Sequence, residues 1–236
     1  MQRTASISRV AIALLALGIG VVGCGSSPSS KNASGTSAAS NTSAATTSAK
    51  AQSKVAPRTF PAGPNPTIAS YIQQNGITET PVHRGDPGAP TINLPIPDGW
   101  ADAGPDTPAS AYWAIVDNGP EAAKYTPSIV ATVSKLVGNV DQQKLLDLAA
   151  GELKNLPGFK AMGDDSTTTF ANFPASQLGG TWTQGGQTKA IAQKTVVIPG
   201  SGGVYLLRLS ADCLDNQIDQ ALPATITIDD KATVAL

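Results

Sequence analysis

Cysteine and histidine are almost absent from this chain of 236 residues, which has two cysteines and one histidine. Two cysteines are too few for the disulfide framework of a small secreted domain, and the sequence contains no C-x-x-C or H-E-x-x-H zinc pattern. A G-x-S-x-G elbow, which would present a nucleophilic serine before a helix, is also missing. The sequence therefore carries no catalytic or metal-binding motif, and we expect no cofactor.

Acidic residues are missing from the first part of the chain, because the first acid is Glu79. From residue 65 to residue 236 there are 10 basic and 17 acidic residues, a net charge of −7. This balance argues against nucleic acid, which attracts basic surfaces. Residues 65–236 are long enough for one ordinary domain with a buried core.

The N-terminus has the pattern of a secretory signal peptide over residues 1–23. Arg3 and Arg9 supply the positive region, an uncharged apolar run covers residues 10–22, and Gly23 is the small residue expected beside a cleavage site. The run of thirteen residues is shorter than the ~20 that span a bilayer as a helix.

Cys24 directly follows Val-Val-Gly, and this stretch resembles the lipobox of bacterial lipoproteins. The resemblance implies that Cys24 carries acyl chains such as palmitate and that the signal is removed before it. Two or three chains are needed for a stable anchor, because a single chain binds a membrane only marginally. A plain signal peptide with an incidental cysteine is the alternative.

Residues 24–64 read as a linker between this anchor and the domain at 65–236. They are mostly Ser, Ala, Thr, Gly, Asn and Lys up to residue 58, so they cannot bury enough apolar surface to fold. As a flexible coil, the 40 residues from 25 to 64 would span about 35 Å. Either a bare linker or one with O-linked sugars fits this composition.

The domain alternates between helical and strand patterns. We expect a helix over 66–75, capped by Asn65 and closed at Gly76 by a Schellman motif with Ile77. A second helix should open near Asn139 and run to about 155, and a third should begin at Leu214. Periodicity leaves 224–228 open between strand and helix. Strands are expected at 91–96, 111–116, 128–137, 176–184, 187–198 and 204–210.

Gly185 and Gly186 mark a hairpin, so the last strands should form an antiparallel meander. The order of elements predicts an α+β domain in which one twisted antiparallel sheet is covered by helices. Cys213, beside Leu214 in an apolar segment, is expected to be a buried structural thiol.

The loop at 77–90 holds His83, Arg84 and Asp86, and we single these out as candidate contacts. A lone histidine is weak evidence of catalysis, so a structural bond from His83 to a loop carbonyl or to Asp86 is favoured. Arg84 and Asp86 are expected to pair and brace the loop, and presenting the loop to a partner is the alternative.

Several stretches resemble the LpqN/LpqT family of mycobacterial lipoproteins. They are ITETPVHRGDPGAP at 77–90, PDGW at 97–100, SIVATVSKLVGNVD at 128–141, GELKNLPG at 151–158 and IAQKTVVIPG at 191–200. The resemblance implies a PsbP-like α-β-α sandwich, helix rather than strand over 214–229, and a location on the outer side of the cell membrane, in the envelope. It also implies a non-enzymatic role that involves mycolate-type glycolipids, either by binding them or by assisting their transporters.

An amphipathic glycolipid needs an apolar groove with a few polar groups at its mouth. Five aromatic side chains are candidates for such a lining, with an ordinary core role as the alternative for each: Trp100, Tyr112, Trp113, Trp182 and Tyr205. A second reading makes the domain a protein-interaction module for an envelope or host protein, with no small ligand. An enzyme that uses His83 is the third.

Overall fold

The computed structural model describes residues 54–236 of the chain. The predicted signal peptide, Cys24 and residues 25–53 of the predicted linker lie outside the described residues. Among residues 54–236, no helix is long and apolar enough to cross a membrane.

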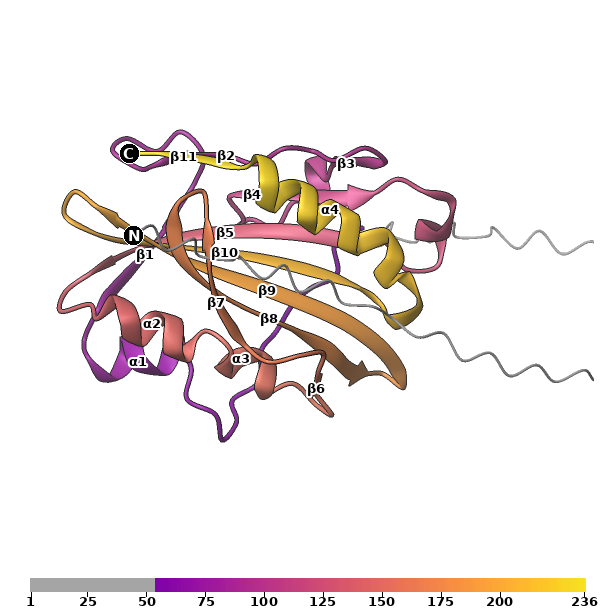
Figure 1. The fold of residues 1–236 in the computed structure, drawn as a ribbon, viewed down its shortest axis with the longest axis horizontal. Helices are drawn as coiled ribbons and strands as arrows, with labels where there is room; N and C mark the ends of the chain where they lie inside the picture. The colour runs from indigo at the N-terminus through magenta and orange to yellow at the C-terminus, as the bar shows by residue number, and fades with distance from the viewer. Residues whose placement is uncertain (1–53) are drawn as a thin grey trace, which may run out of the picture. The chain divides into compact units, whose positions relative to one another are not determined.

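A large antiparallel sheet forms the centre of the fold (Figure 1). Four long strands lie side by side in the order β5 (Ser128–Val137), β10 (Gly203–Leu214), β9 (Gln187–Gly200) and β8 (Phe173–Gln184). Gly185 and Gly186 join β8 to β9 with φ angles of 58° and 78°, which glycine adopts without strain. The predicted meander and its hairpin are confirmed.

Short strands complete both edges of this sheet. On one side, β4 (Trp113–Asp117) and β1 (Thr78–Val82) pair with successive halves of β5, and β3 (Trp100–Asp102) lies beyond β4. On the other side, β7 (Ser166–Phe170) and β6 (Lys160–Ala161) pair with β8. A separate pair is formed by β2 (Thr91–Asn93) and β11 (Thr233–Ala235).

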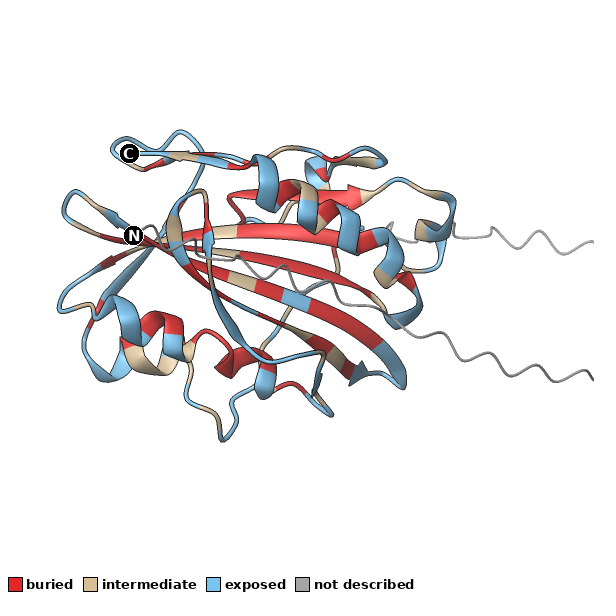
Figure 2. Cartoon of the chain, in the orientation of Figure 1, coloured by how far each residue is buried: buried red, intermediate tan, exposed pale blue. Residues whose placement is uncertain are grey.

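Helices cover both faces of the sheet, as predicted. The helices α1 (Ile68–Gln74), α2 (Gln142–Leu148) and α3 (Gly151–Lys154) cover one face, which we call the α2 face. The long helix α4 (Ile218–Lys231) covers the other, the α4 face. Leu206 packs with α1 and α2 whereas Leu207 packs with α4, because successive residues of a strand point to opposite faces. The inner strands β9 and β10 are accordingly buried along most of their length (Figure 2).

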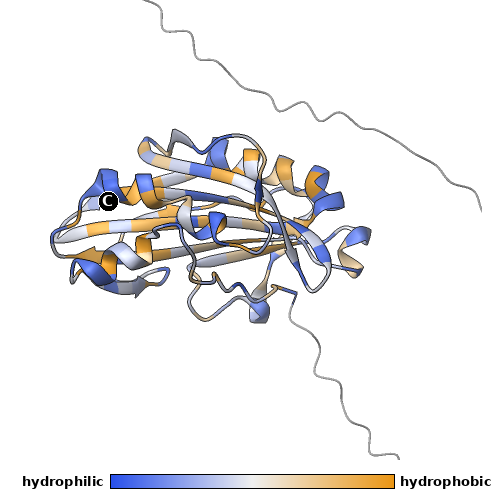
Figure 3. Ribbon diagram, turned by 90° about the horizontal axis from the view of Figure 1, so that it is seen from below, coloured by the Kyte–Doolittle hydropathy of each residue, from blue (hydrophilic) through white to orange (hydrophobic). Residues whose placement is uncertain are grey.

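Polar and apolar residues alternate around the helices and along parts of the strands (Figure 3). Three short 3-10 helices complete the described elements: Gly104–Asp106, Pro120–Ala123 and Asp215–Gln217.

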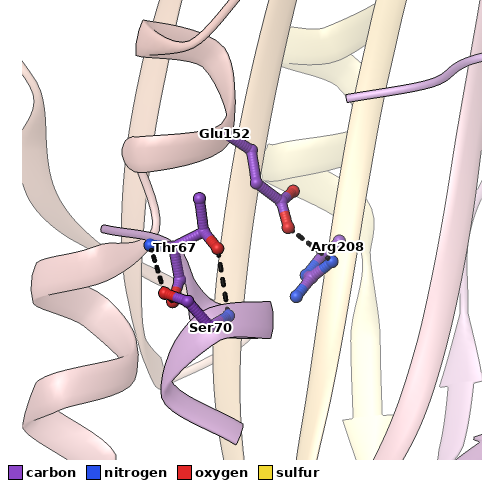
Figure 4. A network of polar contacts seen from close by, with 4 residues as sticks. All are labelled: Thr67, Ser70, Glu152 and Arg208. Atoms are coloured by element: carbon purple, nitrogen blue, oxygen red, sulfur yellow. Dashed lines mark hydrogen bonds and ion pairs between the residues drawn. The ribbon is translucent and has the colours of Figure 1, made fainter. Parts of the chain in front are cut away.

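The first helix begins two residues later than the sequence predicted. Thr67, not Asn65, is the N-cap: its side chain accepts from the Ser70 N–H at 3.1 Å, and the Ser70 hydroxyl accepts from the Thr67 N–H at 3.0 Å (Figure 4). At the other end, the Ile77 N–H donates to the Ile72 oxygen at 3.1 Å, which confirms the predicted Schellman closure.

Two other helix predictions are corrected in detail, and the third helix begins at Ile218 rather than at Leu214, which is the last residue of β10. The predicted helix from 139 to 155 is broken into α2 and α3, and Asp141 rather than Asn139 caps α2. The ambiguous stretch 224–228 is helical, because α4 continues through Pro223. Strands β1, β3, β6, β7 and β11 were not predicted.

Candidate functional site

A segment before the first helix crosses the α2 face of the sheet. We call residues 54–66 the N-terminal strap. Val55 packs among Ala114, Val116 and Val130 on β4 and β5, and Phe60 packs against a cluster that includes Trp182 on β8. The predicted flexible linker covered 24–64, so the structure differs from that prediction for residues 55–60, which lie against the domain.

Arg58 fastens the middle of the strap to the sheet. Its Nη1 donates to the main-chain oxygen of Ser210 at 2.7 Å, and its Nη2 donates to the main-chain oxygen and to the hydroxyl of Ser128, both at 3.1 Å. Burial lowers the pKa of the guanidinium, and the negative charge of Asp212 opposes that shift. An arginine side chain keeps its positive charge even when it is buried in this way, so the Arg58 guanidinium is a cation between the strap and the sheet.

A chain of polar contacts continues from Arg58 along the sheet. Asp212, only 3% exposed, accepts a hydrogen bond from the Tyr125 hydroxyl. Burial, and then the charge of Asp212, raise the pKa of Tyr125, which keeps the phenol protonated. Lys189 donates to the Tyr125 hydroxyl at 3.1 Å and to Gln184 Oε1 at 2.7 Å. Its Nζ lies 4.5 Å from the ring centre of Tyr125 and 5.6 Å from that of Trp182.

A small cavity lies between the strap and the sheet. Its volume is about 10 Å³, which is room for about one water molecule. Its apolar wall contains Phe60, Leu156, Trp182 and Ile191, and a polar end is lined by the following side chains: Arg58, Gln184, Lys189 and Asp212. This is the mixture of surfaces that an amphipathic ligand requires, but the cavity is far too small for a glycolipid while the strap is in place.

Beneath α3 the α2 face carries a largely buried ion pair. Arg208 Nη1 lies 3.3 Å from Glu152 Oε1 (Figure 4). On β9, across from Arg208 and Ser210, Thr195 Oγ1 and both amide atoms of Gln193 are buried without a hydrogen-bond partner among the described residues. Buried polar groups without a hydrogen bond are rare and destabilising. The polar groups of this face are therefore less completely hydrogen-bonded than those of a purely structural interface.

The C-terminal end of the strap is clamped against α3. The Asn155 side chain accepts from the Asn65 N–H at 3.0 Å and donates to the Asn65 oxygen at 2.9 Å. A Cβ on Gly151 would lie 1.9 Å from the oxygen of Pro66, so only glycine allows this approach. The strap is therefore fixed at Asn65 and held by side chains toward Val55.

The predicted aromatic candidates are mostly core residues. Tyr112, Trp113 and Tyr205 are 6%, 5% and 2% exposed and lie in the cluster under α4. Trp100 is partly buried against the same cluster. Trp182 alone lines the cavity under the strap. The structure does not gather the five into one groove.

The loop of His83, Arg84 and Asp86 is exposed and internally braced. The His83 N–H donates to Asp86 Oδ2 at 2.7 Å, and His83 Nε2 lies 3.2 Å from the Ala109 oxygen. Both contacts agree with the predicted structural role of His83. Arg84 lies 5.7 Å above the Tyr112 ring, so its contact is with an aromatic ring rather than with the predicted Asp86.

The sequence did not point to Arg58, Tyr125, Lys189 or Asp212. One signal was present, because polar residues recur at every second position of β10, at 208, 210 and 212, inside an apolar strand. Cys213, the residue after Asp212, is buried as predicted, and burial raises the pKa of its thiol to about 12.

Comparison with known proteins identifies the family. A family model described as "Probable lipoprotein LpqN" matches residues 64–235. Lipoprotein LpqN of Mycobacterium tuberculosis is 49% identical over 173 residues, which cover 73% of this chain and 75% of that protein. The proline-rich 28 kDa antigen homolog of Mycobacterium leprae is 26% identical over 137 residues, 58% of this chain and 49% of that protein.

A solved structure agrees with this match. The crystal structure of LpqN, described as involved in cell envelope biogenesis of Mycobacterium tuberculosis, superposes with a TM-score of 0.70 at 47% identity. The alignment covers 74% of this chain and all of that one. The chain belongs to the LpqN family of lipoproteins.

Proposed function

We propose that the protein is a non-enzymatic cell-envelope lipoprotein that binds envelope glycolipids of the mycolate or trehalose ester type, or assists their transport during envelope biogenesis. The involvement of its relative LpqN in cell envelope biogenesis supports the biological setting. We also propose that the sandwich has a PsbP-like fold.

The observation that carries the proposal is the cavity under the strap, with its apolar wall and its polar end. An acyl chain would lie along Leu156, Trp182 and Ile191, and sugar hydroxyls would meet the polar side chains of Gln184, Lys189 and Asp212 on the sheet. Because the cavity is small, binding requires the strap to move away from the sheet. Movement of the strap breaks the Arg58 contacts but leaves every strand pair of the sheet intact.

Tryptophan fluorescence tests this site directly. A short-chain trehalose ester is titrated into the mature chain, residues 24–236, with Cys24→Ala to keep the protein free of acyl groups. We expect a saturable change that is lost in Trp182→Phe and retained in Trp113→Phe, whose ring lies under α4. If no saturable change occurs, or if it depends on Trp113 instead, binding under the strap is disproved.

Attachment to the cell membrane through Cys24, on the extracytoplasmic side, is part of the proposal. The lipobox-like sequence supports it, and the net charge of −7 over residues 65–236 gives the domain no attraction of its own for anionic lipid. In cells, Cys24→Ala should release the protein from the membrane fraction while its domain stays folded. Full membrane retention of this variant would contradict the lipid anchor.

A non-enzymatic role is supported by the surroundings of Cys213 and His83, the two side chains of the domain that an enzyme could most readily use. Cys213 is 3% exposed with a raised pKa of about 12, so at neutral pH it is a protonated thiol away from solvent. The described contacts of His83 are with Asp86 and a main-chain oxygen. If purified protein hydrolysed an envelope ester and His83→Ala abolished the activity, this part of the proposal would be wrong.

The alternative is a protein-interaction module that binds an envelope protein, such as a mycolate-lipid transporter, or a host protein. Two observations favour it: the loop at 83–86 is exposed, and Leu222 and Ile226 are 40% and 52% exposed one turn apart on α4. A photo-cross-linker at position 84 in membranes distinguishes the two functions. A defined protein adduct supports the module, and lipid adducts alone count against it.

A further inference from the structure

The cavity under the strap contains more positive than negative charge. Two cations and one carboxylate line it, namely Arg58, Lys189 and Asp212. Lys189 is 6% exposed, and its partners among the described residues are neutral: Gln184, the Tyr125 phenol and two rings. A buried charge without a counter-charge is strongly unfavourable. The described residues therefore leave one positive charge uncompensated.

Two residues that line the same cavity have unpaired donors. Trp182 is 9% exposed and its Nε1–H has no acceptor among the described residues, and Arg58 Nε is likewise unpaired. Both atoms are donors only, and Lys189 has three N–H groups of which two are used. The Asp212 carboxylate already faces the Tyr125 hydroxyl. The cavity thus needs an acceptor that is also negatively charged.

From this charge and these donors we infer that the cavity under the strap binds a monovalent, single-atom anion of the chloride type. The volume of about 10 Å³ selects the size, because it matches about one water molecule. A phosphate or carboxylate group has several heavy atoms and does not fit while the strap is in place. The anion would lie among Trp182, Lys189 and Arg58.

The anion connects the strap to the sheet. Arg58 belongs to the strap, whereas Lys189 and Trp182 belong to β9 and β8. Closure of the strap over this face is therefore expected to strengthen as the halide concentration rises. This inference concerns the closed strap and does not depend on the proposed glycolipid ligand.

Bromide quenching of tryptophan fluorescence tests the site. The mature chain with Cys24→Ala is titrated with sodium bromide against sodium gluconate at constant ionic strength. We expect a saturable quenching component in addition to the linear collisional one. Chloride should compete with it, and phosphate should not.

Variants locate the site. The saturable component should vanish in Trp182→Phe and weaken at least tenfold in Lys189→Gln. The matched control is Lys194→Gln, a lysine of the same strand that lies on the α4 face and pairs with Asp229; it should retain the component. Purely linear quenching in the unaltered protein, or saturation that survives both variants, would overturn the inference.

Crystals soaked in bromide give an answer that does not depend on any variant folding. An anomalous peak between the Arg58 guanidinium and the Trp182 indole supports the site. If only water is found at that position after a soak at high bromide concentration, the inference is refuted.

Discussion

The Arg58 guanidinium on the strap donates to the main-chain oxygen of Ser210 on β10 at 2.7 Å, across 152 residues of sequence. This bond, with the two to Ser128, joins the chain that precedes the domain to the centre of the sheet. The contact is polar and lies on a face where several buried polar groups lack hydrogen-bond partners within residues 54–236. We therefore expect the strap to be the least stable cover of the sheet, opening before the strands separate.

Replacing Arg58 with alanine should loosen the strap. The variant loses three hydrogen bonds from a charged donor and leaves Asp212 with one cation fewer, so we expect a loss of about 1–3 kcal/mol in unfolding free energy. Urea unfolding measures the loss, and faster hydrogen exchange at residues 55–60 locates it. The control is Lys54→Ala, because Lys54 is exposed. Equal stability of the two variants would show that Arg58 does not fasten the strap.

Replacing Gly151 with alanine should push the strap away at its other end. The added Cβ would lie 1.9 Å from the Pro66 oxygen, a main-chain atom that can move only if the strap or α3 shifts. We expect a loss of about 1–3 kcal/mol, as for overpacked sites. Gly119→Ala is the matched control, because its Cβ would meet only the Asp117 side chain at 3.4 Å and its φ is −75°. A variant as stable as this control would contradict the close approach.

Stability should fall at alkaline pH, partly through Cys213. Burial raises the pKa of its thiol from 9.0 to about 12, so the folded protein holds the proton more tightly than the unfolded chain. The resulting stability is present below pH 9 and is lost as the pH rises toward 12, at up to about 1.4 kcal/mol per pH unit. Tyr125, whose pKa is also raised, acts in the same direction above pH 10.

Cys213→Ala separates the two contributions. Urea unfolding between pH 8 and pH 11 should show a shallower loss of stability in this variant than in the unaltered protein. Identical slopes would mean that the thiol does not titrate differently in the two states.

The long strands of the sheet were predictable because their apolar residues and turn glycines mark them in the local sequence. The apolar residues of β9 and β10 and the glycine pair at 185–186 fix these strands locally, and β5 was predicted to the residue. The edge strands were not predictable, since a strand such as β1 has only Val82 buried and carries almost no hydrophobic signal.

The strap shows why the candidate site could not be predicted. Its composition is that of a linker, and its ordering depends on partners far along the chain, Ser128 and Ser210. Likewise, Thr67 rather than Asn65 caps α1 because Asn65 is used to bind Asn155. The ordering of the strap and the position of this cap are determined by tertiary contacts, which the local sequence pattern does not reveal.

The most direct test of a ligand site under the strap is the affinity of the mature chain for a short-chain trehalose ester, with and without Arg58→Ala. If the ligand must displace the strap, a weaker strap lowers the free energy that opening costs, and 1.4 kcal/mol corresponds to a tenfold change. We predict that Arg58→Ala binds the ester about tenfold more tightly than the unaltered protein. Equal or weaker binding by the variant would contradict the account.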